Sequence, residues 1–482
     1  MASTQEVENS KAPPSCRIGG ETLLSSGKPL SVLTFTGFII KEAHMSRINP
    51  KDVHAVIGKH MLVDALDLVV DLQHSHGSWI RDARTGRDVL DMTSFFASNA
   101  VGINHPKLTE PAFLAEIGWA AINKVTNSDF YTCEMAETVA VFGEVGIPDY
   151  LPHLFFIEGG TLAVENALKT AFDWKHRMNL AAGRVVHENK LSILHFKNAF
   201  HGRSGYTLSM TNTHDPRKYM YFPRFDWPRV DPPYMLYPAG EAESARVGAA
   251  EEACYAAIRG AAAARPHEIA GLIVEGVMGE GGDRHFRPEF FQGLRRLCDE
   301  LEIFFIIDEV QSGMGMTGKF WAHQHHGVQP DAISFGKKAQ VCGILAGPRV
   351  DTVEHNVFRE PSRINSTWGG NLVDMIRFRR ILEIMRDENL VENARIMGER
   401  LLAGLHEIQT RHAQVSQTRG LGLMCALDVD PEQRKEIKRR CYDQGMLVLP
   451  CGEKSIRIRP HLAVSAPDID RALEILDTAL KG

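Results

Sequence analysis

Short, continuous apolar runs that alternate with longer amphipathic segments constrain the fold of this chain more than any other feature. The runs cover residues 154–157, 192–196, 271–274 and 303–307. Between them lie segments such as residues 288–301, in which apolar side chains recur on one face of a helix. This alternation predicts an α/β domain with a mostly parallel sheet flanked by helices.

After about residue 374 the pattern changes. We expect a long amphipathic helix at residues 389–406, then short strands, then a final helix at residues 467–480. Pro467 lies near the start of that last helix, where a missing N–H group is tolerated. The C-terminal part therefore predicts a second, smaller α+β domain.

These patterns divide the chain into predicted parts. Residues 1–44 are rich in Ser, Gly and Pro and show no clear period, so we expect a disordered tail. We expect residues 45–100 to pack on the smaller domain and residues 101–370 to form the large domain. Residues 371–482 would form the smaller domain itself.

Charge and cysteine content exclude several classes of function. With 24% charged residues and a formal net charge of -6, the chain has no basic footprint for nucleic acid or an anionic membrane. Its 8 cysteines include no CxxC pair, which favours a reducing compartment over disulfides or a zinc site. The apolar stretch at residues 31–40 lies too far from the N-terminus for a signal peptide. We therefore expect a cytoplasmic protein without a membrane span or a metal site.

An acid and a pair of lysines follow the apolar runs. Asp308 comes directly after residues 303–307, and Lys337 and Lys338 follow Gly336. A lysine amine and a carboxylate are what pyridoxal phosphate (PLP) requires, for its aldehyde and for its ring nitrogen. A helix cap and solvated charges are the simpler alternatives. In an extended segment only one of the two lysines would face the cofactor, and the chemistry alone does not decide which.

Two loops carry further candidate groups. Gly160 and Thr161 lie where the run at residues 154–157 meets a predicted helix, whose first N–H groups suit a phosphate. Phe200 could stack on a flat ring, and Arg203 could hold a carboxylate. The alternatives are an ordinary tight turn, a core phenylalanine and a local ion pair.

Other polar segments are less informative when taken singly. Glu275 and Glu280 follow the run at residues 271–274, at the strand end where open α/β sheets place ligands. Residues 365–370 form a hydroxyl-bearing turn, and residues 457–460 form a basic strand. Solvated loops and an exposed strand face would explain each of them equally well.

Taken in order, these segments resemble the class III, fold type I aminotransferases from about residue 49 to the C-terminus. Several stretches are similar in particular to the L-lysine 6-transaminases of that family. They are HLFFIEGGTLAVENALK, NAFHGRSGYTLSMTNT, GEGGDRHFRPEFF, SFGKKAQVCGI and NSTWGGNLVDM. The resemblance implies a PLP enzyme with a large sheet domain and a smaller α+β domain.

The resemblance also implies roles around the cofactor. The Schiff-base lysine of the family follows a small residue, which favours Lys337 over Lys338. Asp308 would pair with the pyridinium and Gln311 would lie near the phenolic oxygen. Phe200 would stack on the ring.

Phosphate binding is implied for residues of two subunits. Gly160 and Thr161 match phosphate binders of the same chain. Thr367 is expected to reach the phosphate of the neighbouring subunit, with Asn365 beside it on the substrate side. The resemblance therefore implies a homodimer with shared sites.

For the substrates, the resemblance implies two arginines and a movable acid. Arg203 would hold the carboxylate of L-lysine, and Arg457 would hold the second carboxylate of 2-oxoglutarate. Glu280 matches the gating glutamate that covers Arg457 when lysine is bound, because a buried unpaired cation is costly. Related enzymes usually have Pro and Gln where this chain has Gly276 and Met278, so we expect a more flexible loop here.

The reaction implied is transfer of the ε-amino group of L-lysine to 2-oxoglutarate. The products would be L-glutamate and 2-aminoadipate 6-semialdehyde, which cyclises to piperideine-6-carboxylate. Ornithine or 4-aminobutyrate is the nearest alternative substrate, because one methylene changes binding by only about 1–3 kcal/mol. A PLP-dependent racemase would not need a 2-oxo acid, and a non-enzymatic scaffold would not need both Lys337 and Asp308.

Overall fold

The computed structural model describes residues 48–481, so the predicted tail at residues 1–44 lies outside the described residues. The chain divides into two units, Met1–His60 and Met61–Gly482. The described part of the first unit contains a 3-10 turn, Pro50–Asp52, and helix α1, Val53–Ile57.

A 7-stranded sheet forms the large domain, with strand order β3-β9-β8-β7-β6-β4-β5. The strands are β3 (His153–Ile157), β4 (Ser192–Phe196), β5 (Arg229–Val230), β6 (Ile269–Glu275), β7 (Phe304–Asp308), β8 (Ala332–Phe335) and β9 (Cys342–Ala346). Strands β5, β4, β6, β7 and β8 are parallel, whereas β9 runs antiparallel to both β8 and β3. The predicted mostly parallel sheet is confirmed, and every predicted apolar run lies in a strand or at its edge.

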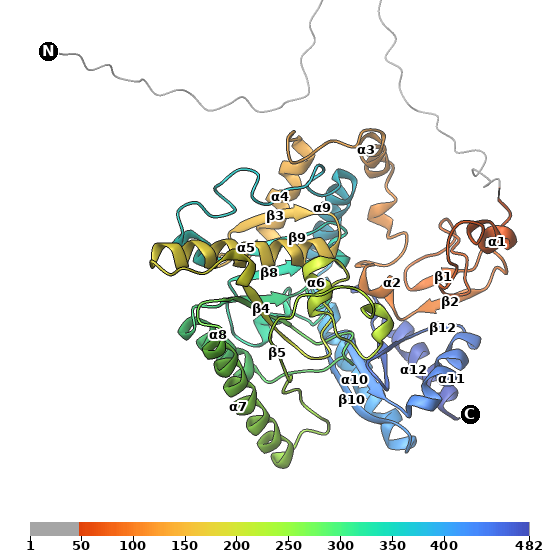
Figure 1. The fold of residues 1–482 in the computed structure, drawn as a ribbon. Coiled ribbons are helices and arrows are strands. Elements are labelled where there is room, and N and C mark those ends of the chain that lie inside the picture. Colours follow the sequence, from red (N-terminus) through yellow and green to blue (C-terminus); the bar gives the residue numbers. More distant parts are fainter. Residues whose placement is uncertain (1–47, 482) are drawn as a thin grey trace, which may run out of the picture. The chain divides into compact units, whose positions relative to one another are not determined.

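Helices cover both faces of this sheet (Figure 1). Phe304 and Ile306 of β7 pack with apolar side chains of helix α5 (Gly160–Ala181), whereas Phe305 and Ile307 pack with α8 (Pro288–Glu300). Alternate residues of a strand point to opposite faces, so a continuous apolar run is what a strand covered on both sides requires. The remaining helices up to residue 387 are α2 (Ser94–Ala97), α3 (Pro111–Ile122), α4 (Cys133–Val145), α6 (Gly205–Met210), α7 (Glu241–Ala264) and α9 (Leu372–Asp387).

The C-terminal part has a 4-stranded antiparallel sheet with strand order β10-β11-β14-β13. Its strands are β10 (Ser416–Leu421), β11 (Met424–Asp428), β13 (Leu449–Cys451) and β14 (Ser455–Ile458), and its helices are α10 (Leu390–Arg411), α11 (Pro431–Asp443) and α12 (Ala466–Lys481). A further 3-stranded sheet joins β1 (Trp79–Arg81) and β2 (Asp88–Asp91) to β12 (Met446–Leu447). The α+β character predicted for this part is confirmed, while the domain boundaries at residues 44, 100 and 370 stay predictions.

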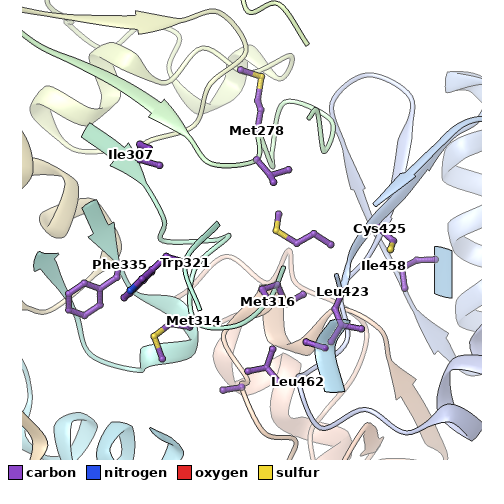
Figure 2. Packing of buried hydrophobic residues seen from close by; sticks show 14 of the residues in the cluster. Met278, Ile307, Met314, Met316, Trp321, Phe335, Leu423, Cys425, Ile458 and Leu462 are labelled. Carbon is purple, nitrogen blue, oxygen red and sulfur yellow. The ribbon is translucent and has the colours of Figure 1, made fainter. Parts of the chain in front are cut away.

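One apolar cluster continues from the large sheet to the C-terminal sheet. Figure 2 shows Ile307 and Phe335 at one end, Met316 in the middle, and Leu423 and Ile458 at the other end. All five side chains are at most 1% exposed. The ends of β7 and β14, which carry candidate site residues, are therefore held on one continuous core. In the part of the chain that the structure describes, no helix is long and apolar enough to cross a membrane.

Candidate active site

Three side chains meet at the carboxyl ends of neighbouring parallel strands. Glu275, Asp308 and Ser334 are register partners across β6, β7 and β8. The buried Asp308 accepts hydrogen bonds at Oδ1 from the Ser334 hydroxyl and the Val310 N–H, both at 3.0 Å. Its Oδ2 lies 2.8 Å from Nδ1 of His201. The Asp308 carboxylate is therefore fixed in orientation by the fold.

Glu275 is a buried anchor and not the solvated loop acid that the sequence allows. Its Oε1 accepts from the Phe200 N–H at 3.1 Å, and its Oε2 accepts from the Gly279 N–H at 2.9 Å. Burial raises the pKa of Glu275 to about 7, and the nearby Asp308 charge adds to that rise while His201 opposes it. One side chain thus ties two site loops to the end of β6.

The two lysines lie on a 3-10 turn after β8, Lys337–Ala339, and not in an extended segment. Lys338 is buried, and its amine donates to the carbonyl groups of Gln311 at 2.9 Å and Ala97 at 3.5 Å. Lys337 has a left-handed backbone with φ 52, and its amine makes no hydrogen bond or ion pair within residues 48–481. The geometry therefore leaves Lys337 as the available amine.

The surroundings of Lys337 also favour a reactive amine. Burial lowers the pKa of Lys337, and the charges of Arg457 and Arg459 lower it further, against the attraction of Asp308. A lysine with a lowered pKa is more often neutral, which is the form that reacts with an aldehyde.

The N-terminus of α5 faces the loop that carries Phe200. Gly159 has φ 90, and no side chain of the described residues caps the helix, so its first N–H groups stay available. A Cβ on Gly202 would lie 2.6 Å from Oγ1 of Thr161. Gly202 therefore allows the loop to approach Thr161 closely.

Gln311 and Arg457 line the same narrow cavity, with Met92, Thr93, Phe96, Leu449 and Arg459. The Oε1 atom of Gln311 is buried and has no hydrogen-bond donor in the part of the chain between residues 48 and 481. A Cβ on Gly279 would lie 1.8 Å from this atom, so a larger residue at that position would require the Gln311 side chain to move. Both observations suit an amide that is meant to face a ligand.

Glu280 lies between two cations. Its Oε2 is 3.1 Å from Nη2 of Arg457, and its Oε1 pairs with the amine of Lys218. Burial alone would raise the pKa of Glu280, but Arg457 and Lys218 hold it below its usual value. The Nε and Nη1 groups of Arg457 are buried and unpartnered among the described residues. Arg457 therefore keeps donors free for a further anion.

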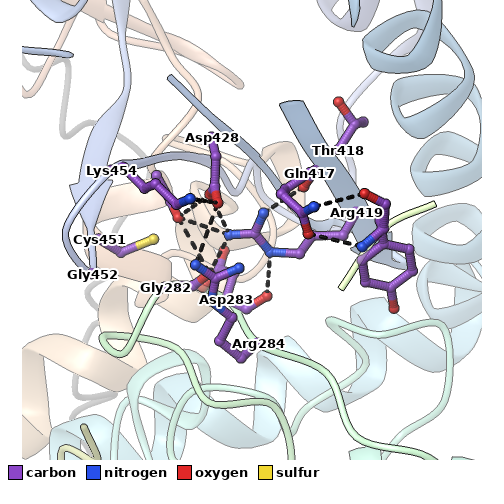
Figure 3. Close-up of polar contacts among 12 residues, drawn as sticks. Gly282, Asp283, Arg284, Gln417, Thr418, Arg419, Asp428, Cys451, Gly452 and Lys454 are labelled. Atoms are coloured by element: carbon purple, nitrogen blue, oxygen red, sulfur yellow. Dashed lines mark hydrogen bonds and ion pairs between the residues drawn. The ribbon is translucent and has the colours of Figure 1, made fainter. Parts of the chain in front are cut away.

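The backbone of the Glu280 loop is held firmly at its base (Figure 3). Arg419 donates to the Asp283 carbonyl at 2.8 Å and pairs with Asp428 at 2.9 Å. The Gly452 N–H donates to the Glu280 carbonyl at 2.8 Å. We expected Gly276 to loosen this loop, but a Cβ there would lie 3.0 Å from Ala322 and from Ser312. Gly276 therefore serves close packing.

The remaining predicted site residues lie more openly. Arg203 is exposed, with its guanidinium 6.0 Å from the centre of the Phe200 ring. Asn365 and Thr367 are exposed too, and their loop is fastened by the Ser128 hydroxyl, which bonds the Thr367 carbonyl at 2.9 Å. Neither of these two side chains hydrogen-bonds Lys337, Asp308 or Glu280 in the described chain. Asn365 and Thr367 are thus not tied by hydrogen bonds to the buried part of the predicted site.

Sequence reasoning missed the parts played by two residues. His201 lies inside a motif that we singled out, but its contact with Asp308 spans 107 positions and has no sequence signal. Lys218 follows Asp215-Pro216-Arg217, and its partner Glu280 is 62 positions away. The one sequence signal for a rigid turn at Lys218 was Pro216 directly after Asp215, since proline is common at the first position of a capped helical turn.

Known proteins with similar sequences and structures show the family to which this site belongs. A model of the family described as aminotransferase class-III matches residues 61–480. The chain belongs to the class-III aminotransferases. The predicted family, fold and enzyme class are confirmed, and PLP is the cofactor of this family. The site fits PLP, because it offers a buried carboxylate, an unpaired lysine amine and an uncapped helix N-terminus.

Individual relatives are similar over nearly the whole chain. L-lysine-epsilon aminotransferase of Mycobacterium tuberculosis is 51% identical over 434 residues, which cover 89% of this chain and 96% of that protein. A solved lysine aminotransferase from M. tuberculosis matches with a TM-score of 0.87 and 50% identity, over 90% of this chain and 99% of that one. A 4-aminobutyrate aminotransferase of Mycosarcoma maydis is 33% identical, over 86% of this chain and 85% of that protein.

Proposed function

We propose that this class-III aminotransferase moves the ε-amino group of L-lysine to 2-oxoglutarate, giving L-glutamate and 2-aminoadipate 6-semialdehyde. The observation that carries the proposal is the ion pair between Glu280 and the buried Arg457, next to Lys337 and Asp308. With the pair intact, the site has no net charge and suits lysine. With Glu280 turned away, Arg457 is free to bind a dicarboxylate. The 51% identity to a lysine ε-aminotransferase, against 33% to a 4-aminobutyrate aminotransferase, supports lysine as the amine.

The chain's own groups fill the roles that the chemistry needs. PLP, when bound, supplies a protonated ring that takes up negative charge from the reacting carbon. Lys337 would hold the cofactor and then move a proton from Cε of the substrate lysine. Asp308, oriented by Ser334 and His201, would keep the ring nitrogen protonated.

Other residues would fix the cofactor in place. Gly160 and Thr161 at the N-terminus of α5 would bind its phosphate. Gln311, whose buried Oε1 lacks a donor among the described residues, would face the phenolic oxygen. Phe200, held by Glu275 through its backbone N–H, would cover the ring.

Substrate recognition would use two arginines at two places, and each would bind a carboxylate of a substrate. The exposed Arg203 beside Phe200 would bind the carboxylate of L-lysine, far from the reacting ε-amine. Arg457 would bind the carboxylate next to the keto group of 2-oxoglutarate once Glu280 moves away. Asn365, which is exposed on the loop at residues 362–370, would also contact the substrate.

A homodimer would complete the site. Large apolar side chains on α3 are exposed, with Trp119 at 74% and Ile122 at 71%. The exposed Trp368 lies next to Thr367, and Lys124 contacts its ring at 3.8 Å. Exposed apolar surface of this kind is typical of an interface. A second copy would cover it, and Thr367 of the partner subunit would then reach the phosphate.

We also propose a cytoplasmic location. The 7 cysteines within residues 48–481 are all free, and all but Cys133 are buried. This pattern suits a reducing compartment.

The test is a half-reaction without a keto acid. Purified holoenzyme is mixed separately with L-lysine, L-ornithine and 4-aminobutyrate while the visible absorbance of bound PLP is followed. We expect rapid loss of the band with lysine, together with a piperideine product. Preference for ornithine or 4-aminobutyrate would keep the fold and chemistry and replace the substrate. No reaction with any of the three would overturn the proposal.

A further inference from the structure

We infer that Lys218 is a specificity-determining residue, which receives the Glu280 carboxylate when a dicarboxylic keto acid takes its place on Arg457. The inference rests on the proposed function, because it assumes that one site alternates between an amine with a single carboxylate and a 2-oxo diacid. It names the cation with which the Glu280 carboxylate stays paired after it leaves Arg457.

Glu280 already uses its two oxygens for two different cations. Oε2 faces Nη2 of Arg457 at 3.1 Å, whereas Oε1 pairs with the amine of Lys218. The side chains of Glu280, Lys218 and Arg457 are 24%, 16% and 7% exposed, so the three charges share a partly dry environment. A carboxylate leaving Arg457 can therefore turn about its contact with Lys218 and stay paired.

Two cations around Glu280 make its displacement less costly than a single ion pair would. An anion that enters a site with a buried ion pair must first break that pair, and the displaced carboxylate then lacks a partner. Lys218 supplies the partner and also shares the attraction of Glu280 with Arg457. Both effects lower the cost of opening Arg457 to a second carboxylate.

The turn that carries Lys218 is built to hold it there. Asp215 accepts from the Arg217 N–H at 3.1 Å, and Pro216 fixes the first position of the 3-10 turn Pro216–Lys218. The Lys218 amine also lies 5.7 Å from the centre of the Phe200 ring. The Lys218 side chain therefore points toward Phe200 and Glu280.

Arg217 provides a matched control. It is the neighbouring cation on the same turn, its side chain is 81% exposed, and it pairs with Asp215. No contact joins it to Glu280 or Arg457 within the described residues. Arg217→Met removes one positive charge, as Lys218→Met does, but leaves the contacts of Glu280 with Lys218 and Arg457 intact.

The experiment starts from enzyme loaded with pyridoxamine phosphate, which is independent of the amine substrate. We expect Lys218→Met to raise the concentration of 2-oxoglutarate needed for half-maximal return of the visible band by about fivefold or more. The dissociation constant for glutarate, a dicarboxylate that cannot react, should rise by the same factor. Arg217→Met and Lys218→Arg should behave as wild type, and the lysine half-reaction of Lys218→Met should be unchanged.

A double mutant separates action through Glu280 from direct binding. In a Glu280→Gln background, adding Lys218→Met should change neither 2-oxoglutarate nor glutarate binding further. An equal loss in both backgrounds would mean that Lys218 contacts the diacid itself, and would overturn the inference. Wild-type affinities in Lys218→Met would overturn it as well. Failure of the loaded wild type to react with 2-oxoglutarate would instead refute the proposed function.

Discussion

His201 Nδ1 lies 2.8 Å from Oδ2 of Asp308, and the contact is buried at the end of β7. The other nitrogen of this ring, Nε2, is buried without a partner among residues 48–481. His201 therefore contacts one oxygen of the carboxylate, whereas Ser334 donates to the other. The hydrogen bond connects the loop after β4 to the acid that we assign to the cofactor ring.

Replacing His201 by Phe should weaken cofactor binding. The Asp308 carboxylate would lose a hydrogen bond, and hydrogen bonds to charged groups contribute about 1.5–3 kcal/mol. We expect the dissociation constant of PLP to rise by roughly 10-fold or more. Titration of apoenzyme with PLP, followed by visible absorbance, measures it. An unchanged constant in a folded variant would show that Asp308 needs no support from His201.

The two adjacent lysines should differ in their effects. Lys337→Ala should abolish the visible band of bound PLP, because it removes the available amine. Lys338→Ala should keep the band and lower the melting temperature, since it leaves the Gln311 and Ala97 carbonyls without their buried donor. Absorbance spectra and thermal unfolding of the two purified variants decide between them. The reverse pattern would transfer the catalytic role to Lys338.

Glu275 should make the stability of the apoenzyme depend on pH. Its pKa is raised from 4.5 to about 7, so between these values the folded chain keeps a proton that the unfolded chain releases. Stability due to this group is therefore complete below pH 4.5, falls as pH rises, and is lost above pH 7, on the order of 3 kcal/mol in total.

Glu275→Gln cannot lose a proton and should remove that slope. Thermal unfolding of both apoenzymes across this pH range gives the difference curve. A difference that does not vary with pH would mean that Glu275 is ionised throughout. In either case the variant should be less stable at low pH. The backbone N–H groups of Phe200 and Gly279 both donate to Glu275, and in the variant one of them would face the amide NH2 group of the glutamine.

Gly279→Ala should displace Gln311. The added Cβ would lie 1.8 Å from Oε1 of Gln311, and overpacking of this kind costs about 1–3 kcal/mol. We expect a shifted absorbance maximum of the bound cofactor, since the phenolic oxygen would lose its neighbour. Gly240→Ala is the control, because a Cβ at Gly240 has nothing within 4 Å. A normal spectrum in Gly279→Ala would argue that Gln311 does not face the cofactor.

The sequence alone predicts the sheet well, because strands covered on both faces require unbroken apolar runs such as residues 303–307. It also places Asp308, since an acid directly after such a run must lie at a strand end. It does not predict that Glu275 is buried, because that depends on the N–H groups of Phe200 and Gly279, which lie on separate loops. Contacts between distant segments have no periodicity that a sequence could display.

The same limit applies to the charges around Arg457. A basic strand and a glutamate loop are visible in the sequence, but the ion pair between Lys218 and Glu280 exists only once both loops are folded. The choice between Lys337 and Lys338 depended on a turn, Lys337–Ala339, that the residue types do not reveal. The resemblance to a family favoured Lys337 over Lys338, but it did not indicate Lys218.

The apolar cluster that runs from Ile307 to Ile458 has a consequence for turnover. Two lobes that share one core cannot swing apart without exposing apolar surface to water. A wide opening between the lobes would therefore cost free energy, and we expect substrates to enter while the shared core stays intact. In the mechanism that we propose, the rotation of one carboxylate, that of Glu280, then switches the site between its two substrates.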